Sequence, residues 1–393
     1  MSFDPRFGYN FHDLREKARV RLPHGLFEFI DRGVEDDAAI RRNHASFERV
    51  GLYQRPLVDV SERDQAITLF GRRQASPFCL APTGAAGLLW YEGEVATARA
   101  AGHAGVPYCM STGSITSMER VAEAAPDTDL WFQLYLFPDK AMSHELVVRA
   151  REAGYSTLIV TVDTTVTPNR EHNLRNGFTI PLRPNLRNVA DVLTHPRWGA
   201  GVIGRYLVTT GMPRFHNLPK ALQQSMTANM RKTGLMPKNP ALTWDDLRTV
   251  RDMWEGPLIV KGITHPEDAR QALRCGADGV VVSNHGGRTL DNAPAPLDVL
   301  PAIAEAVGDR MTVLMDSGIR RGSDAVKALA LGADAVMVGR AAMWGTAVGG
   351  EAGARHALAM LRDEIDRVLG FVGCSSIGAI KPSCCRVERI PYL

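Results

Sequence analysis

The chain has 393 residues, 45% of them hydrophobic and 23% charged, which suits one large α/β domain with additions or two ordinary domains. A net charge of only +3 excludes a protein that binds nucleic acid through its overall charge. The first twenty residues lack the apolar core of a signal peptide, and no long uncharged apolar run occurs, so neither a secretory leader nor a transmembrane helix is expected. The six cysteines form no C-x-x-C pair, which predicts reduced thiols, a cytoplasmic protein and no metal site.

Residues 1–76 come before the first apolar, strand-like run. Their pattern predicts an N-terminal helical cap and a small hairpin built from the segments 51–60 and 66–73. Residues 77–393 are expected to form the main domain.

Eight short apolar runs follow, and each ends in small or polar residues. Runs this continuous are typical of parallel strands that are buried on both faces. Helical patterns lie between most of them, for example at 93–105 and 321–333. Eight such units predict an α/β fold of the (β/α)8 TIM barrel type, and an open doubly wound sheet is the alternative. The runs span 77–84, 107–114, 130–136, 157–164, 257–263, 279–286, 312–318 and 335–340.

The connection between the fourth and fifth runs, residues 164–257, is far too long for a βα loop. Residues 243–254 within it have the pattern of a helix, with Thr243 as the N-cap and two aspartates in the first turn. Residues 178–240 are therefore expected to be a long insertion after the fourth strand.

The seventh and eighth runs are each followed by a glycine and an arginine. A glycine at a strand end lets backbone N–H groups approach an anion, and a guanidinium adds charge-assisted hydrogen bonds. Barrels often bind phosphate at this place. The residues Gly318, Arg320, Gly339 and Arg340 therefore predict a site for a phosphorylated cofactor or a phosphorylated substrate.

The sixth run ends in "SNHGGRTLD", which places His285 close to Arg288. A histidine titrates near neutral pH and is a natural general base, and Asp163 at the end of the fourth strand can orient it. Arg288 and Arg170 are candidates for holding a substrate carboxylate. Lys261 ends an apolar strand and needs an anionic partner; an anionic reduced flavin or a Schiff base would both explain it.

Motifs along nearly the whole chain resemble the FMN-dependent 2-hydroxy acid oxidases and dehydrogenases, a family that includes glycolate oxidase, lactate dehydrogenase and mandelate dehydrogenase. The motifs occur in the family's order, and "HPRW" and "GMPRFHNL" look most similar to the mandelate dehydrogenase branch. The resembling segments are "RLPHGLFEFIDRGVEDD", "APTGAAGLLWYEGE", "FQLY", "TVDTTVTPNREHNLRNGF", "VKGI", "SNHGGRTLD", "DSGIRRGSD" and "LGADAVMVGR".

The resemblance implies a role for each catalytic and substrate-binding candidate. His285 would take a proton from the substrate while the α-hydrogen passes to FMN, and Asp163 would pair with it. Tyr135 would hydrogen-bond near the substrate hydroxyl, and Arg170 and Arg288 would hold the carboxylate. Lys261 would stabilise the reduced flavin. The implied FMN-binding residues are Thr83, Gly84, Ser111, Gln133, Thr161, Lys261, Ser283, Asp316, Gly318, Arg320, Gly339 and Arg340.

Three positions bear on the substrate and on the electron acceptor. Phe29 stands where the family usually has a tyrosine whose hydroxyl binds the substrate carboxylate. Gly113 replaces a bulky residue of the glycolate oxidases and leaves room for an aromatic substituent, as in (S)-mandelate. Gly84 replaces an alanine that is common in efficient oxidases. These features favour an aromatic (S)-2-hydroxy acid and a slow reaction with oxygen. A lactate-oxidising member of the family, or an FMN enzyme acting on an amine or a peptide-like compound, is the alternative.

Other classes remain open at this stage. An isomerase or lyase that uses Lys261 on a phosphate-binding barrel is one. A non-catalytic barrel bound to a membrane surface is another. The resemblance also implies a homo-oligomer, a tetramer in the relatives.

The insertion combines basic and apolar residues. Between Arg183 and Lys238 there are nine Lys or Arg and one acid, Asp191, interspersed with apolar residues such as Trp198 and Leu207. This pattern is typical of segments that bind an anionic membrane surface. It favours nucleic acid less, because no binding motif accompanies the charge, and no nucleic-acid partner is expected. A basic loop packed over the barrel, or an oligomer contact, is the alternative. We expect a peripheral protein at the inner face of the cell membrane that passes electrons to a membrane quinone.

Overall fold

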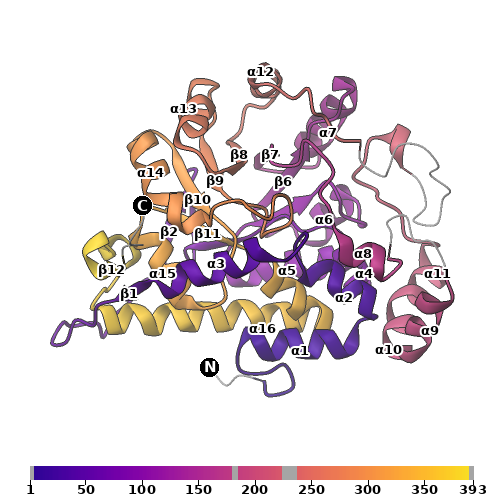
Figure 1. Ribbon diagram of the computed structural model, residues 1–393, viewed down its shortest axis with the longest axis horizontal. Helices are drawn as coiled ribbons and strands as arrows, with labels where there is room; N and C mark the ends of the chain where they lie inside the picture. The colour runs from indigo at the N-terminus through magenta and orange to yellow at the C-terminus, as the bar shows by residue number, and fades with distance from the viewer. Residues whose placement is uncertain (1–3, 179–184, 224–236, 389–393) are drawn as a thin grey trace.

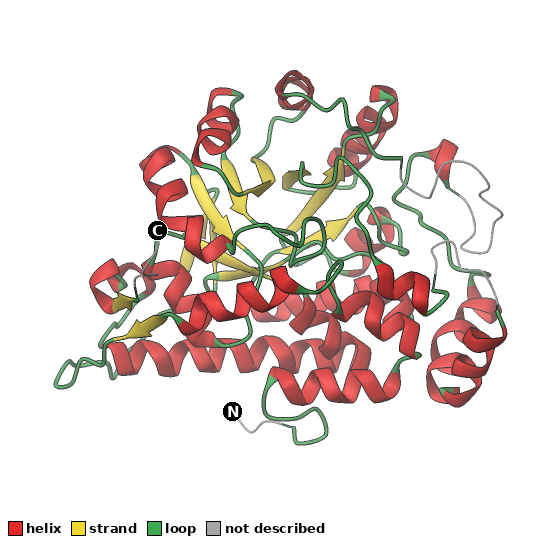
Figure 2. Cartoon of the chain, in the orientation of Figure 1, coloured by secondary structure: helices red, strands yellow, loops and turns green. Residues whose placement is uncertain are grey.

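The computed structural model describes residues 4–178, 185–223 and 237–388. Its centre is a closed parallel barrel of eight strands that follow one another in chain order, and β11 closes the ring by pairing with β4 (Figure 2). The predicted (β/α)8 barrel is confirmed, and the open sheet is excluded. The barrel strands are β4 (Phe78–Leu80), β5 (Tyr108–Ser111), β6 (Leu130–Tyr135), β7 (Thr157–Thr161), β8 (Leu258–Ile263), β9 (Gly279–Val282), β10 (Thr312–Met315) and β11 (Ala335–Val338).

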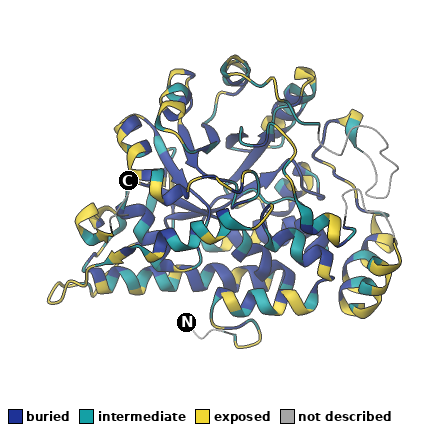
Figure 3. Ribbon diagram, viewed as in Figure 1, coloured by how far each residue is buried: buried dark blue, intermediate teal, exposed yellow. Residues whose placement is uncertain are grey.

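The strands are short and almost entirely buried, which explains their unbroken apolar sequences (Figure 3). Inward side chains such as Trp131, Ile159 and Met337 fill the barrel, so it is a packed core and not a channel. The helices that pack around the strands are α5 (Gly93–Ala104), α6 (Met118–Ala124), α7 (Lys140–Glu152), α12 (Trp244–Met253), α13 (Pro266–Arg274), α14 (Pro296–Val307), α15 (Gly322–Ala330) and α16 (Arg340–Val372).

Local sequence signals fix several helix ends. The helix expected at 243–254 is α12, and Thr243 and Asp246 form a reciprocal capping box at its start. Helix α5 ends at Gly105, which takes the left-handed conformation that glycine adopts without strain. Helix α16 is kinked at Gly349 and Gly350, where the backbone leaves helical geometry beside Trp90.

The N-terminal segment forms a helical cap, but its strands pair differently from the expectation. The hairpin lies within the second predicted segment, as β2 (Ile67–Leu69) and β3 (Arg72–Gln74). The first segment forms β1 (Val50–Leu52), which pairs with the C-terminal β12 (Cys385–Val387). A long-range partner of this kind leaves no local turn signal, so the sequence pattern cannot show it. The cap helices are α1 (Phe11–Arg21), α2 (His24–Asp31) and α3 (Ala38–Glu48).

The described part of the insertion is helical and lies at one end of the molecule's long axis (Figure 1). Trp198, Val202 and Tyr206 are buried there, and the Trp198 indole N–H donates to the carbonyl of Leu88, at 2.7 Å. These residues anchor the insertion to the barrel, so they are not available to a membrane. The elements are α8 (Glu171–Arg175) before it, then α9 (Leu186–Thr194), α10 (Pro196–Trp198), a π-helix (Gly199–Gly204), α11 (Arg205–Thr209) and a short 3-10 helix (Lys220–Leu222).

Candidate active site

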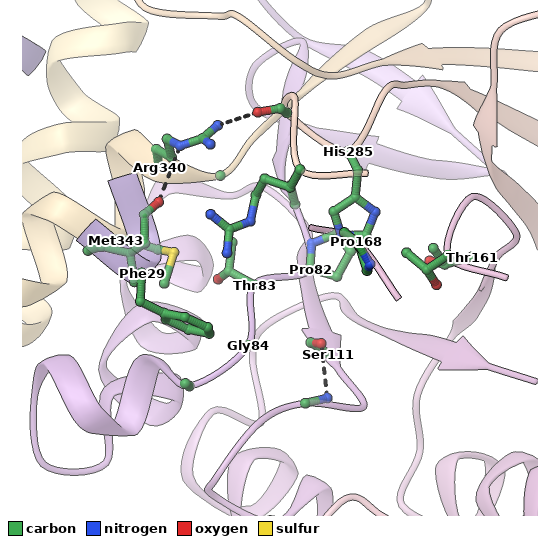
Figure 4. Close-up of a pocket in the computed structure, with 18 of the residues that line it drawn as sticks. Phe29, Pro82, Thr83, Gly84, Ser111, Thr161, Pro168, His285, Arg340 and Met343 are labelled. Carbon is green, nitrogen blue, oxygen red and sulfur yellow. Dashed lines mark hydrogen bonds between the residues drawn. The ribbon is translucent and has the colours of Figure 1, made fainter. Parts of the chain in front are cut away.

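A cavity of about 720 Å³ opens where the barrel strands end. Phe29 from the cap, His285 from the loop after β9 and Arg340 at the start of α16 surround it (Figure 4). All but two of the residues predicted for the site line this cavity. The lining residues are Phe29, Thr83, Gly84, Ser111, Gly113, Gln133, Tyr135, Thr161, Arg170, Lys261, His285, Arg288, Asp316, Gly318, Arg320, Gly339 and Arg340.

The two predicted residues that do not line the cavity support residues that do. Asp163 accepts a hydrogen bond from the His285 imidazole, with 2.9 Å between Oδ1 and Nδ1. Ser283 accepts hydrogen bonds from the Lys261 ammonium at 2.8 Å and from the backbone N–H of His285 at 3.0 Å. Asp163 and Ser283 therefore hold His285 and Lys261 in place without lining the cavity themselves.

The electrostatics of the His285–Asp163 pair suit proton abstraction. Burial lowers the pKa of His285 below its usual value, although attraction to Asp163 opposes the shift. Burial works against ionisation of Asp163, but attraction to His285 and the hydrogen bond to it leave the pKa of the carboxyl lowered. The imidazole is therefore neutral at neutral pH, and an ionised carboxylate stands ready to stabilise the imidazolium.

The backbone at this place depends on glycines. His285 itself has a positive φ of 58°, and Gly286 follows with φ 65°. A Cβ at Gly286 would stand 2.7 Å from the Arg340 guanidinium. Gly262, on β8, has φ 108°, and a Cβ there would stand 2.6 Å from the Asp163 Cβ. Glycine at 286 lets the Arg340 guanidinium approach the backbone beside His285, which explains a glycine next to His285 in the sequence. Glycine at 262 leaves room for Asp163 beside β8.

Lys261 has its anionic partner inside the protein. Its ammonium lies 2.7 Å from the Asp316 carboxylate, and both side chains are buried. Burial opposes the charge, but attraction to Asp316 and then to Asp163 raises the pKa of Lys261 above its usual value. The amine therefore stays protonated, which argues against the Schiff-base alternative because that chemistry needs a free amine.

Two half-buried arginines, Arg320 and Arg340, lie close enough to repel each other at the phosphate end. Burial and repulsion from Arg340 lower the pKa of Arg320 to about 9. The Arg340 guanidinium donates to the backbone carbonyls of Ile30, Asp31, Arg32 and Gly286 and to no carboxylate among the described residues. Gly318 has φ 106°, and its position against Phe47 leaves no room for a Cβ. This cradle has the charge and the backbone approach that bind a phosphate dianion.

A second pair of arginines lies at the reactive end. Burial and repulsion from Arg170 hold the pKa of Arg288 well below its usual value. The Nε of Arg170 is buried, and the described residues offer it no hydrogen-bond partner. The Arg288 guanidinium also lies over the Phe29 ring, 5.5 Å from its centroid. Two desolvated, mutually repelling cations call for an anion between them.

Sequence reasoning did not assign four residues of the site. Phe178 and Phe215 add aromatic walls, and the Phe178 ring packs against that of Phe29 with 5.4 Å between centroids. Lys238 lines the cavity, although the sequence pattern placed it among the membrane-facing basic residues. Gly262 could have been found in "VKGI", because a glycine in a buried strand often marks a close approach.

Comparison with known proteins supplies the context for this geometry. The family model "FMN-dependent dehydrogenase" matches residues 18–387. The chain belongs to this family. It is 39% identical to (S)-mandelate dehydrogenase of Pseudomonas putida, over 97% of this chain and 95% of that one. It is 41% identical to L-lactate dehydrogenase of Caulobacter vibrioides, over 96% of this chain and 97% of that one.

Solved structures agree with the family. A crystal structure described as the monotopic membrane protein (S)-mandelate dehydrogenase superposes with a TM-score of 0.89 at 39% identity, covering 97% of this chain and 99% of that one. A mandelate oxidase variant with (S)-mandelic acid gives a TM-score of 0.80 at 35% identity, with the same coverage.

The cavity fits the FMN that the family requires. Besides the phosphate cradle, it holds the Gln133 amide Nε2 and the Thr161 hydroxyl, which are buried without a partner among the described residues. Unpaired buried polar groups of this kind call for a polar ligand. The Ser111 hydroxyl donates to Gln133 Oε1, at 3.1 Å, which fixes the amide with its N–H groups free for the ligand. The protein is an FMN-dependent dehydrogenase.

Proposed function

We propose that this enzyme oxidises an (S)-2-hydroxy acid to the 2-oxo acid. The observation that carries the proposal is the His285–Asp163 pair, which shares one cavity with Arg170 and Arg288. A base beside two cations suits a substrate that carries a hydroxyl next to a carboxylate. The activities named for the similar dehydrogenases of mandelate and lactate support the same chemistry.

Each residue then has one task. Arg170 and Arg288 hold the carboxylate, and Tyr135, whose pKa is raised by burial and which therefore stays protonated, donates to the substrate hydroxyl oxygen. His285 removes the hydroxyl proton, and Asp163 stabilises the charged imidazole that results. When bound, FMN would supply the oxidant: it would take up the α-hydrogen and the two electrons of the broken C–H bond, while the hydroxyl proton goes to His285.

We assign FMN binding to the domain of residues 77–393, with residues 1–76 as a cap and 178–240 as an insertion. Gly318, Arg320, Gly339 and Arg340 would hold the phosphate, and Lys261 with its partners Asp316 and Ser283 would contact the isoalloxazine and the ribityl chain. The polar groups assigned to the isoalloxazine are those of Thr83, Gly84, Ser111, Gln133 and Thr161.

An aromatic substituent on the substrate fits the cavity better than a methyl group. Phe29, Phe178 and Phe215 supply aromatic walls, and Gly113, which has no side chain, lines the same cavity. A mandelate-like acid is therefore the proposed substrate. Lactate is the second candidate, because a lactate dehydrogenase shares 41% of the sequence.

We also propose peripheral attachment to the inner face of the cell membrane, with a quinone as electron acceptor and a homo-oligomeric, tetrameric assembly. Leu186, Leu193 and Val208 of the insertion are at least 74% exposed, and a similar protein is described as monotopic. No helix among the described residues is long and apolar enough to cross a bilayer. Helices such as α9 and α11 could lie in the membrane interface without crossing the bilayer.

The test is anaerobic bleaching of the bound flavin by (S)-mandelate, L-lactate and glycolate in parallel. We expect mandelate to bleach it fastest. A faster reaction with lactate would transfer the assignment to the second candidate. If none of the three acids bleaches the flavin but an amine or a peptide-like compound does, the proposal is wrong.

A further inference from the structure

Lys238 is a cation of the active-site cavity to which the reaction gives no task. Its ammonium lies over the ring of Tyr135, 5.2 Å from the centroid. The side chain is half-buried, and within the described ranges it makes no ion pair and no hydrogen bond. Burial and then repulsion from Arg170 lower its pKa, while Asp163 opposes the shift. A lysine held this way has lost part of its hydration without gaining an anion.

The neighbouring residues tie Lys238 to the barrel. The Asn239 side-chain amide donates to the backbone carbonyl of Phe137, at 3.4 Å. Phe137 is buried and follows β6 closely, and Tyr135 is the last residue of that strand. The backbone of Lys238 is therefore fixed beside the strand end that carries Tyr135, and its ammonium stays near the substrate end of the cavity.

The remaining cations of the cavity already have anions assigned to them. One is paired with Asp316, two form the phosphate cradle, and two hold the substrate carboxylate. Among the Lys and Arg side chains of the described cavity lining, Lys238 is the one to which neither Asp316, the FMN phosphate nor the α-carboxylate is assigned. The five cations that already have an anion assigned are Lys261, Arg320, Arg340, Arg170 and Arg288.

We propose that Lys238 is a specificity-determining residue that binds a second acceptor group on the substrate. The preferred substrates would be 2-hydroxy acids whose substituent carries a second carboxylate or another strong hydrogen-bond acceptor. The inference rests on the proposed oxidation of 2-hydroxy acids and refines its substrate class. The aromatic walls and Lys238 together suit a substituent that is apolar along its length and anionic at one point.

The experiment compares substrates in pairs that differ only in the second group. One pair is L-lactate and L-malate, and the other is mandelate and 4-carboxymandelate, so a short and a long reach are both sampled. The variants are Lys238→Met, which keeps the length of the side chain, and Lys238→Arg, which keeps the charge. Lys17→Met, on an exposed position of α1, is the matched control.

We expect Lys238→Met to lower the ratio of kcat/KM for the acidic member over the plain member by about 10- to 100-fold in at least one pair. Lys238→Arg should keep the ratio within about threefold of the wild type, since the charge remains. Lys17→Met should leave it unchanged. Calorimetric Kd values for the corresponding 2-oxo acids should change in parallel, and they do not depend on turnover.

Two outcomes would overturn the inference. Unchanged ratios in both pairs would mean that Lys238 reaches no second group. An equal fall for all four substrates would mean that it binds the common carboxylate or only supports the fold. A Lys238→Met protein that loses its FMN would be replaced by Lys238→Gln, and the same ratios would decide. If wild-type protein is bleached by none of the acids, the proposed function fails; if it is bleached and the ratios stay constant, only the role of Lys238 fails.

Discussion

At the scale of single residues, the chemistry of the site depends on pairs of groups that set each other's charge. The hydrogen bond of 2.9 Å between His285 and Asp163 combines a neutral base with an ionised partner. The ion pair of 2.7 Å between Lys261 and Asp316 keeps a buried ammonium charged. If one member of either pair were removed, the other would remain buried without its partner, at a cost in the free energy of folding.

Replacement of His285 by alanine tests the assigned base. The His285→Ala protein should still bind FMN, because the imidazole is not part of the phosphate cradle. Flavin bleaching by the substrate should slow by about 10²–10⁴-fold, the usual cost of losing a general base. Stopped-flow absorbance under anaerobic conditions measures this. A rate within a few-fold of the wild type would remove His285 from the role.

The pH dependence follows from the direction of the His285 shift. The base must be neutral to act, so kcat/KM rises with pH through the His285 pKa. Because burial lowers that pKa, the acid limb should lie below the value of about 6.5 for a free imidazole. Asp163→Asn removes an attraction that raises the pKa, so the limb should move to still lower pH while kcat falls. A wild-type acid limb of kcat/KM with an apparent pKa above 7 would contradict the assignment of His285 as the base.

Phe29 tests how the carboxylate is held. In Phe29→Tyr a hydroxyl is added beside Arg288, whose guanidinium lies over the ring. A new hydrogen bond of about 0.5–1.5 kcal/mol would lower KM roughly two- to tenfold. Lactate should gain more than mandelate, because a small acid relies more on its carboxylate. Steady-state kinetics with both acids measures the effect, and equal KM values before and after the change would place the carboxylate elsewhere.

At the scale of elements, the insertion separates into an anchored face and an exposed face. Trp198, Val202 and Tyr206 pack inward, whereas Leu193 and Leu207 point to solvent. Arg197 and Arg205 are exposed as well, whereas Arg183, Arg231 and Lys232 lie outside the described residues. The membrane hypothesis therefore rests on the outer face of α9 and α11 and no longer on every apolar residue of the segment.

Serine at Leu186, Leu193, Leu207 and Val208 tests that face. These side chains are 92%, 74%, 54% and 83% exposed, so the change should leave the fold intact. Sedimentation with anionic liposomes at low salt should fall at least tenfold, because each apolar side chain lost from the interface weakens binding. Flavin bleaching by substrate should be unaffected.

Phe371→Ser is the matched control, since Phe371 is 64% exposed near the C-terminal end of α16. That end of α16 and the helices α9–α11 lie at opposite ends of the molecule (Figure 1). If the control loses liposome binding to the same extent, or the intact protein never sediments with vesicles, the insertion is not a membrane anchor.

At the scale of the whole molecule, FMN binding and barrel stability are expected to be linked. Arg320 and Arg340 follow the neighbouring strands β10 and β11, and an anion bound between them would relieve their repulsion.

Removal of FMN should therefore lower the Tm. Free FMN at about 100 times its Kd should stabilise the fold by about 2.7 kcal/mol over the apoprotein. Riboflavin, which lacks the phosphate, should stabilise it much less. Thermal unfolding monitored by circular dichroism distinguishes the three samples. Equal stabilisation by riboflavin and FMN would mean that the arginines do not bind the phosphate.

The sequence by itself determined the eight strands, the order of the barrel and many of the residues that line the cavity. Buried parallel strands have a continuous apolar pattern that is readable locally, and barrel chemistry gathers where those strands end. Residues such as His285, Arg288 and Gly318 were therefore identifiable from their position after a strand. The tertiary structure alone decided what depends on contacts between distant segments. It paired β1 with β12, gave Lys261 the partner Asp316, and brought Lys238 from a basic insertion into the cavity. A local pattern reports only a residue's own burial and charge, whereas a partner more than fifty residues away is selected by the packing of the complete chain.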